Sequence, residues 1–233
     1  QMYMCDISAM DGQVLKADWL HEYPAEKISS NWPCYFGIDF ATTADYQDLA
    51  ERDYFALSVI RVMPGGGGVL VDGVREHLTQ ADAETKVKAM ASIYNPVVIG
   101  IEKYGSGEGI LTLMQRMSSL PVVGCPYKGT PTKSKGQRYE AGLAPMFTTG
   151  RAWISDQKNK FIDHFKLEWI NWDGDQKKSR TGHDDVLDSV YYGFYVSGAH
   201  LVSLPEPKDN LNPETVQRKF TPSPWSSLGA RRK

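Results

Sequence analysis

The sequence predicts an α/β fold with a central mixed sheet, antiparallel in its first three strands and parallel after them, flanked by helices. Three segments rich in β-forming residues lie between residues 35 and 74 and are joined by short connections, as in an antiparallel meander. From residue 80 onward, helical and strand patterns alternate, as in parallel βαβ units. With 41% hydrophobic and 23% charged residues, the chain has the composition of a globular protein with a full core.

The first three strands are expected over residues 35–40, 54–62 and 69–74. Each combines apolar and β-branched side chains and is bounded by polar or glycine-rich stretches. Residues 64–68, Pro-Gly-Gly-Gly-Gly, lie between the second and the third of them. This run precedes a strand and lacks the Lys-Ser/Thr pair of a phosphate-binding loop, so it is interpreted as a tight turn.

A change of period marks the first helix. Apolar residues step by four, three and four positions from Ala83 to Tyr94, and Thr79 stands where an N-cap is expected. The short apolar segment 96–101 that follows is predicted to be a buried strand, and the acid Glu102 comes at its end.

Strands and helices continue to alternate through the rest of the domain. Pro145 interrupts the helix expected at 137–149, so that helix is predicted to kink or end early. The last helix is expected over residues 184–196, where Val186 and Phe194 share one apolar face. The other elements expected after Glu102 are a helix at 110–117, strands at 121–125 and 151–154, and a helix at 161–169.

Composition and charge argue against several classes of protein. No apolar run approaches the roughly 18 residues that span a bilayer, and no signal peptide opens the chain, so a cytoplasmic protein is expected. Cys5, Cys34 and Cys125 are widely spaced, which argues against disulfides and against a zinc site. The net charge of −2 does not indicate a nucleic-acid binder, but acids gathered in a metal site can mask a basic groove.

Two acids stand where buried strands are expected to end. Asp39 follows the apolar residues of the first strand, and Glu102 ends the fourth. Charged side chains are usually excluded from buried strands because desolvating them is costly. One such acid is explained by a strand end that faces water. Two of them, on strands that can be neighbours in the sheet, predict a shared site.

A third acidic element opens the last helix. Asp188 lies four residues after Asp184 and three after Asp185, so several carboxylates crowd one side of the first turns. Acids at a helix N-terminus are also favoured by the macrodipole, which is the simpler explanation. Carboxylates packed this closely repel one another unless a cation neutralises them, and an all-oxygen ligand set favours Mg²⁺ or Mn²⁺ over zinc.

Three stretches together resemble the nuclease domain of phage large terminase subunits, which are DNA-packaging motor proteins. They are FGIDFA at 36–41, VIGIEKYG at 98–105 and HDDVLDS at 183–189. That family has an RNase H-like fold with one acid on its first strand, a second ending its fourth strand and a third at the start of a helix. The resemblance therefore implies an RNase H-like fold for this chain.

Weaker similarities point to the same family. Lys135 and Arg138 are similar to its K-x-x-R pair, and GRAWI at 150–154 is similar to the passage that follows that pair. Asp53 stands where the family often has an acid. The resemblance extends over about residues 1–200.

The resemblance implies a DNA endonuclease that uses two divalent cations, Mg²⁺ or Mn²⁺, about 3.5–4 Å apart on either side of the scissile phosphate. Asp39 is expected to bridge the two ions. Glu102 and either Asp184 or Asp185 are expected to hold the ions from the two sides. The remaining candidates, for a further ligand or a supporting role, are Asp188, Asp53 and His183.

Basic side chains occur in two segments that should border this site, one after the fifth strand and one before the acidic helix. There they would neutralise phosphates and make binding salt-dependent, although solvated loop charge is the alternative interpretation. Nothing in the sequence predicts base reading, so double-stranded DNA is expected as a partner with little sequence specificity. The candidate DNA-binding residues are Lys128, Lys133, Lys135, Arg138, Lys177, Lys178 and Arg180.

The chain is expected to be organised in three parts. Residues 1–33 are predicted to lead in from an upstream ATPase domain, 34–203 to form the nuclease domain and 204–233 to form a C-terminal tail. The chain has no phosphate loop ending in Gly-Lys-Ser/Thr, so ATP hydrolysis is not expected of it. The resemblance also implies a role in cutting concatemeric viral DNA, the portal and small terminase subunit as partners, and the cytoplasm of an infected bacterium as the location.

Two rival interpretations remain open. GIDFATT at 37–43 is close to the D-x-G-T-T phosphate loop of sugar kinases and actin-like proteins, although Ala41 replaces the glycine and a second phosphate loop is absent from the sequence. A junction resolvase, which is another RNase H-like nuclease, would share the acids, and fold alone does not separate it from a terminase.

Overall fold

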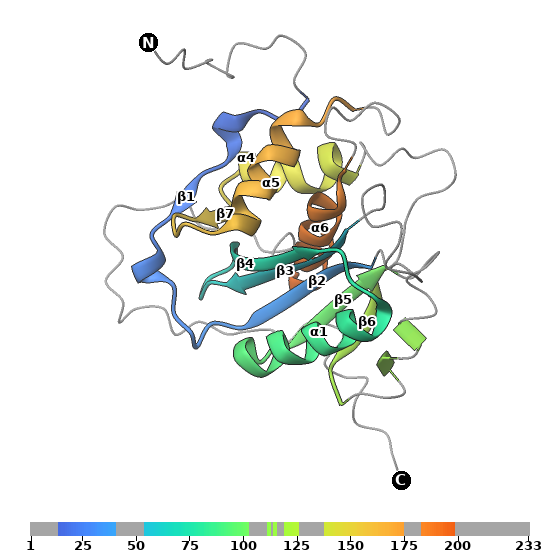
Figure 1. Ribbon diagram of the computed structural model, residues 1–233. Coiled ribbons are helices and arrows are strands. Elements are labelled where there is room, and N and C mark those ends of the chain that lie inside the picture. The colour runs from blue at the N-terminus through green and yellow to red at the C-terminus, as the bar shows by residue number, and fades with distance from the viewer. Residues whose placement is uncertain are drawn as a thin grey trace.

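The computed structural model describes residues 14–40, 54–102, 111–112, 114–115, 119–125, 138–174 and 183–198 of the 233-residue chain. Its centre is a seven-stranded sheet with the order β1-β7-β4-β3-β2-β5-β6 (Figure 1). The strands are β1 (Glu22–Tyr23), β2 (Cys34–Phe40), β3 (Phe55–Val62), β4 (Gly68–Glu76), β5 (Val98–Glu102), β6 (Val122–Cys125) and β7 (Ala152–Ser155). The helices are α1 (Gln80–Tyr94), α4 (Ala144–Thr148), α5 (Lys160–Asn171), α6 (Asp185–Ser197), the π-helix η5 (Tyr139–Leu143) and the short 3-10 helices η2 (Ala17–Trp19) and η3 (Ala25–Lys27). Of the described helices, none is both long and apolar enough to cross a membrane.

The strand directions follow the split that the sequence predicts. β3 runs antiparallel to both of its neighbours, β2 and β4, whereas β5 is parallel to β2 and β6 is parallel to β5. The glycine-rich turn between β3 and β4 contains Gly65, Gly66 and Gly67, all with positive φ, a conformation that side chains other than glycine rarely adopt. The expected mixed sheet, antiparallel first and parallel afterwards, is confirmed.

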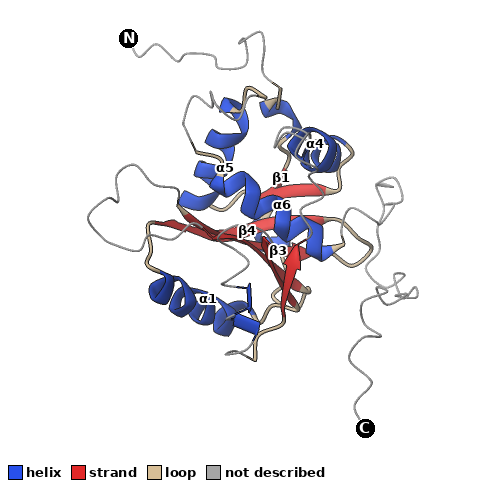
Figure 2. Ribbon diagram, turned by 90° about the vertical axis from the view of Figure 1, so that its right-hand side faces the viewer, coloured by secondary structure: helices blue, strands red, loops and turns tan. Residues whose placement is uncertain are grey.

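Helices cover both faces of the sheet. Figure 2 shows α1 on one face and α4, α5 and α6 on the other. Alternate side chains of each strand point to opposite faces, so each face has its own apolar cluster. Ile38 of β2 packs in one cluster with Val87 of α1. Ile60 of β3 packs in the other cluster with Val190 of α6.

α6 lies directly against the backbone of β2. A Cβ atom on Gly37 would stand 2.0 Å from Ser189 O and 2.1 Å from Gly193 N, so this approach requires glycine. Ser58 Oγ on β3 also donates a hydrogen bond to Ser189 O, at 2.8 Å. The contact brings the first turns of α6 to the end of β2 where Asp39 lies.

Two elements differ from their sequence prediction. Part of the segment 1–33, which was expected only to lead in from an upstream domain, joins the sheet: β1 pairs in parallel with β7, and Leu15 is fully buried. The helix expected to kink or end early at Pro145 does not end there. Residues 139–143 form the π-helix η5, an irregular turn directly before Pro145, and α4 continues through Pro145 to Thr148.

Some expectations fall on parts of the chain outside the described ranges. The helix expected at 110–117 is described at 111–112 and 114–115, where the backbone is helical. The tail expected at 204–233 lies outside those ranges. The other expected strands and helices form within a few residues of their predicted bounds.

Candidate active site

Asp39 and Glu102 stand at the same edge of the sheet, on neighbouring strands. β2 and β5 are parallel, and their register pairs the residue before Asp39 with the residue before Glu102. Two residues before each acid, Gly37 and Gly100 face α6, against which an added Cβ atom would clash. Because side chains two residues apart lie on one face of a strand, both acids lie on the α6 side of the sheet.

α6 adds two buried carboxylates from its first turns. Asp185 and Asp188 are each 4% exposed, which is rare for acids unless they are paired or bind a cation. Asp188 Oδ1 lies 3.1 Å from Arg138 Nη1, so it has a positively charged partner. These carboxylates are therefore interior groups and not surface charges at a helix end.

The hydroxyl of Tyr192, on α6, lies within electrostatic reach of acids from three elements. Burial raises the pKa of Tyr192 above its ordinary value, and three nearby carboxylates raise it further. Those carboxylates belong to Asp188, Glu102 and Asp39. Arg138 Nη1 donates a hydrogen bond to the same hydroxyl at 3.0 Å. Acids from α6, β5 and β2 thus all act on one buried hydroxyl.

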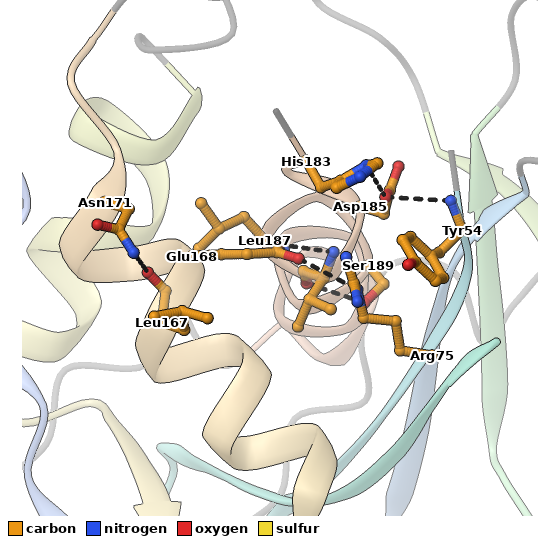
Figure 3. Close-up of polar contacts among 10 residues, drawn as sticks. Tyr54, Arg75, Leu167, Glu168, Asn171, His183, Asp185, Leu187 and Ser189 are labelled. Atoms are coloured by element: carbon orange, nitrogen blue, oxygen red, sulfur yellow. Dashed lines mark hydrogen bonds and ion pairs between the residues drawn. The ribbon is translucent and has the colours of Figure 1, made fainter. Parts of the chain in front are cut away.

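Asp184 and Asp185 are adjacent in the chain but bind in different directions. Asp184 Oδ2 accepts a hydrogen bond from the Tyr139 hydroxyl at 3.3 Å, on the side of η5. Asp185 Oδ2 accepts from the backbone N–H of Tyr54 at 3.1 Å and lies 3.7 Å from His183 Nδ1 (Figure 3). The two carboxylates therefore face different sides of the site, as neighbouring residues at a helix start do.

Aromatic and basic side chains lie on the Asp185 side of the site. The Arg75 guanidinium carbon is 3.5 Å from the centre of the Tyr54 ring, a favourable cation–π contact. His77 packs on the same ring at 3.7 Å between centroids, and His183 meets it edge-on at 5.0 Å. Arg75 and His77 had no sequence signal, since alternate polar residues at the end of a strand are usually solvated.

Glu168 of α5 is a buried acid that was not among the predicted site residues. Its Oε2 accepts hydrogen bonds from the Val186 and Leu187 N–H groups at 3.0 and 3.1 Å, and its Oε1 lies 3.5 Å from Arg75 Nε (Figure 3). Burial raises the pKa of Glu168 to about 8. One signal was present in the sequence: Glu168 comes three residues after Phe165, on the face that the apolar pattern predicts to be buried.

The donor set fits a hard divalent cation. Asp39, Glu102 and Asp188 offer carboxylate oxygens, the ligands that Mg²⁺ and Mn²⁺ prefer. Within the described ranges, however, no three His, Cys, Asp or Glu side chains are grouped tightly enough to hold one ion.

The structure places only some of the predicted basic and auxiliary residues. Arg138, predicted to contact DNA, is directed at Asp188 and Tyr192, and His183 lies beside Asp185. The other candidates, which lie outside the described residues, are Asp53, Lys128, Lys133, Lys135, Lys177, Lys178 and Arg180.

Fold and site together define the RNase H-like class: a mixed sheet with acids at the ends of two neighbouring strands and an acidic helix packed across them. Residues 36–195 match the family model of the terminase RNaseH-like domain, so the chain belongs to that family. The match spans β2, β5 and α6, which carry the acids. It confirms the predicted family and fold, and it favours a terminase nuclease over the sugar-kinase and resolvase alternatives.

Several solved structures with a similar fold are phage large terminases or their nuclease domains. The large terminase nuclease of thermophilic phage G20c with bound magnesium has a TM-score of 0.57 and 17% identity, over 80% of this chain and 98% of that chain. The g2p nuclease domain of bacteriophage SPP1 with bound Mn has a TM-score of 0.51 and 14% identity, over 78% and 99%. The match to the HK97 bacteriophage large terminase, with a TM-score of 0.50 and 13% identity, covers 79% of this chain and 42% of that chain. Among curated protein sequences, none matches the chain.

Proposed function

We propose that this terminase nuclease domain is a Mg²⁺- or Mn²⁺-dependent endonuclease that cuts concatemeric viral DNA during genome packaging. The observation that carries the proposal is that the register of β2 and β5 and the packing of α6 bring carboxylates from all three elements to one side of the sheet. Buried acids repel one another and are costly to desolvate, so their retention in one place favours a role in binding cations. The magnesium and Mn in the G20c and SPP1 nuclease structures support the same class of ion.

Each carboxylate has a proposed role that follows from its element. Asp39 would bridge two cations, because β2 lies between β3 and β5. Glu102 on β5 and Asp188 on α6 would hold them from either side. Asp185 is the member of the aspartate pair assigned as a ligand, because it is buried, while half-buried Asp184 supports the site through Tyr139. When bound, the two cations would activate the attacking water and stabilise the departing 3′ oxygen.

We further propose that DNA is held by its phosphates and without base reading. Arg138 places a positive charge beside Asp188, where it can also face a phosphate brought to the acids. Binding through lysine and arginine would weaken as salt increases, because counterions are released from the DNA. The other residues proposed for this role are Lys128, Lys133, Lys135, Lys177, Lys178 and Arg180.

The proposed setting is a larger packaging protein in the cytoplasm of an infected bacterium. Residues 1–33 would lead in from an upstream ATPase domain, with Leu15 and β1 already packed on the nuclease, 34–203 would form the rest of the nuclease and 204–233 a tail. The match to 42% of the HK97 large terminase chain supports this arrangement. The portal and the small terminase subunit are the partners that such a setting implies.

Cleavage of supercoiled plasmid DNA tests the proposal. The full chain with Mg²⁺ or Mn²⁺ should produce nicked and linear DNA, and EDTA should stop the reaction. Asp39→Asn should abolish cleavage, whereas Asp163→Asn, which alters an exposed acid of α5, should cleave at the wild-type rate. Cleavage that survives both EDTA and Asp39→Asn would remove the proposal, and ATP binding with no cleavage at all would favour the kinase-like alternative.

A further inference from the structure

The first turns of α6 carry two of the proposed metal ligands, so the placement of this helix end sets their positions. A helix N-terminus leaves backbone N–H groups without partners inside the helix, and an N-cap side chain commonly accepts hydrogen bonds from them. Asp184 occupies the N-cap position of α6, and its Oδ2 accepts from the Tyr139 hydroxyl. Asp184 therefore does not cap the helix, and the backbone N–H groups of Val186 and Leu187 donate instead to a residue of another helix.

Glu168 of α5 supplies this cap. Its single oxygen Oε2 accepts from the Val186 N–H at 3.0 Å and from the Leu187 N–H at 3.1 Å. A carboxyl group in this position also faces the positive end of the helix dipole. Figure 3 shows the side chain reaching from α5 across to α6, and Glu168 is 4% exposed. The contact therefore ties two helices together inside the protein.

Arg75 of β4 extends the contact toward the acids. Its Nε lies 3.5 Å from Glu168 Oε1, and its guanidinium carbon lies 3.5 Å from the centre of the Tyr54 ring. The Tyr54 N–H in turn donates to Asp185 Oδ2 at 3.1 Å. A continuous chain of contacts thus runs from the helix cap to the carboxylate of Asp185.

Burying a glutamate at this place costs free energy, because other acids lie nearby. Burial raises the pKa of Glu168 to about 8, and the negative charges of Asp185 and Asp184 contribute in the same direction. A serine or asparagine at the N-cap position would satisfy amides of the first turn without burying another acid beside them. A need for helix stability alone does not explain this arrangement.

We propose that Glu168 is a positioning residue which, together with Arg75, fixes the first turns of α6 so that Asp185 and Asp188 bind metal; this inference rests on the proposed function. Its side chain binds the amides of Val186 and Leu187, and its effect on the metal would pass through them. Groups that orient metal ligands from outside typically change metal affinity about 10–100-fold when they are lost.

The experiment compares variants of the full chain at a temperature where each is folded. Glu168→Ala removes the cap, Glu168→Asp keeps a carboxyl group but shortens its reach, and Glu168→Gln keeps an oxygen that can accept from both amides. Phe165→Leu is the matched control, because Phe165 is fully buried on the same helix and packs without polar contacts to α6. Calorimetry measures Mn²⁺ binding, plasmid cleavage gives the half-saturating Mn²⁺ concentration, and hydrogen exchange follows the Val186 and Leu187 amides.

Glu168→Ala should weaken Mn²⁺ binding by about 10-fold, raise the half-saturating Mn²⁺ concentration equally and speed exchange of both amides. Glu168→Asp should change the Mn²⁺ affinity, the half-saturating Mn²⁺ concentration and the amide exchange rates in the same directions. Glu168→Gln should keep most of the wild-type Mn²⁺ affinity. Phe165→Leu should lower Tm without changing the Mn²⁺ affinity. Wild-type Mn²⁺ affinity in both Glu168→Ala and Glu168→Asp would overturn the positioning role alone. A wild-type chain that neither binds Mn²⁺ nor cleaves DNA would overturn the proposed function and this inference with it.

Discussion

The α1 face and the α6 face of the sheet differ in what they bury. On the α1 face, the cluster that includes Ile38 and Val87 consists of apolar side chains. On the α6 face, the apolar cluster lies next to the buried acids Glu168, Asp185 and Asp188. Burying acids lowers stability unless they are paired or bind cations, and under the proposed function the α6 face would bury these acids in order to bind cations. Neighbouring residues of one strand therefore serve different purposes, according to the face on which they lie.

The largest expected effect comes from an acid on the α6 face. Glu102→Gln should lower the rate of plasmid cleavage by about 100-fold or more, the scale of losing one group that stabilises charge in a transition state. Its Tm should stay equal or rise, because one repelling carboxylate is removed. Initial cleavage rates and thermal melts in EDTA measure the two quantities. A lower Tm with an unchanged rate would place Glu102 among the structural residues and break the comparison.

A matched change on the α1 face should affect stability and spare activity. Ile99 lies on the same strand as Glu102 and is fully buried in the α1-face cluster. Ile99→Ala should lower the free energy of unfolding by about 2–5 kcal/mol, because it leaves a cavity. Urea unfolding measures this loss, and cleavage well below Tm should match wild type. Val123→Ala, at a 41% exposed position on β6, is the control and should change stability by less than about 0.5 kcal/mol.

The smallest expected effect is a change in how stability depends on pH. The pKa of Glu168 rises from 4.5 to about 8 in the folded protein, so the folded chain keeps a proton that the unfolded chain releases between these values. Stability from this group is complete below the lower value and is lost as pH rises through the higher one. Glu168→Gln should therefore flatten the decline of Tm over this window, measured in EDTA. If Tm declined with pH equally steeply in the wild type and in Glu168→Gln, burial on the α6 face would not raise the pKa of Glu168.

Most of the fold could be predicted because its elements have regular apolar patterns. β2, β3 and β5 are short apolar runs, and α1 has a clear helical period from Ala83 to Tyr94. β1 could not be found in this way, because a strand of two residues has no period and is defined by its pairing with β7. The π-helix before Pro145 also has no pattern of its own, since its extra residue per turn depends on tertiary packing.

The candidate site could be predicted only where an acid interrupts an apolar pattern. Asp39 and Glu102 do so at strand ends, and α6 begins with its own acids. The contacts of Glu168 with α6, and of Arg138 with Asp188, join residues distant in sequence, so no local pattern contains them. The roles assigned to these acids stay predictions until the cleavage experiments are done.

The absence of a side chain at Gly37 has a consequence for how the acids move. Where Gly37 meets Ser189 and Gly193, main chain touches main chain, so no rotamer can lengthen or shorten the gap between β2 and α6. The separation of Asp39 from the first turns of α6 is then limited by the radii of backbone atoms. Thermal motion should carry the strand and the helix as one rigid body, and any closing of the carboxylates around an ion must come from their own side-chain torsions or from β5.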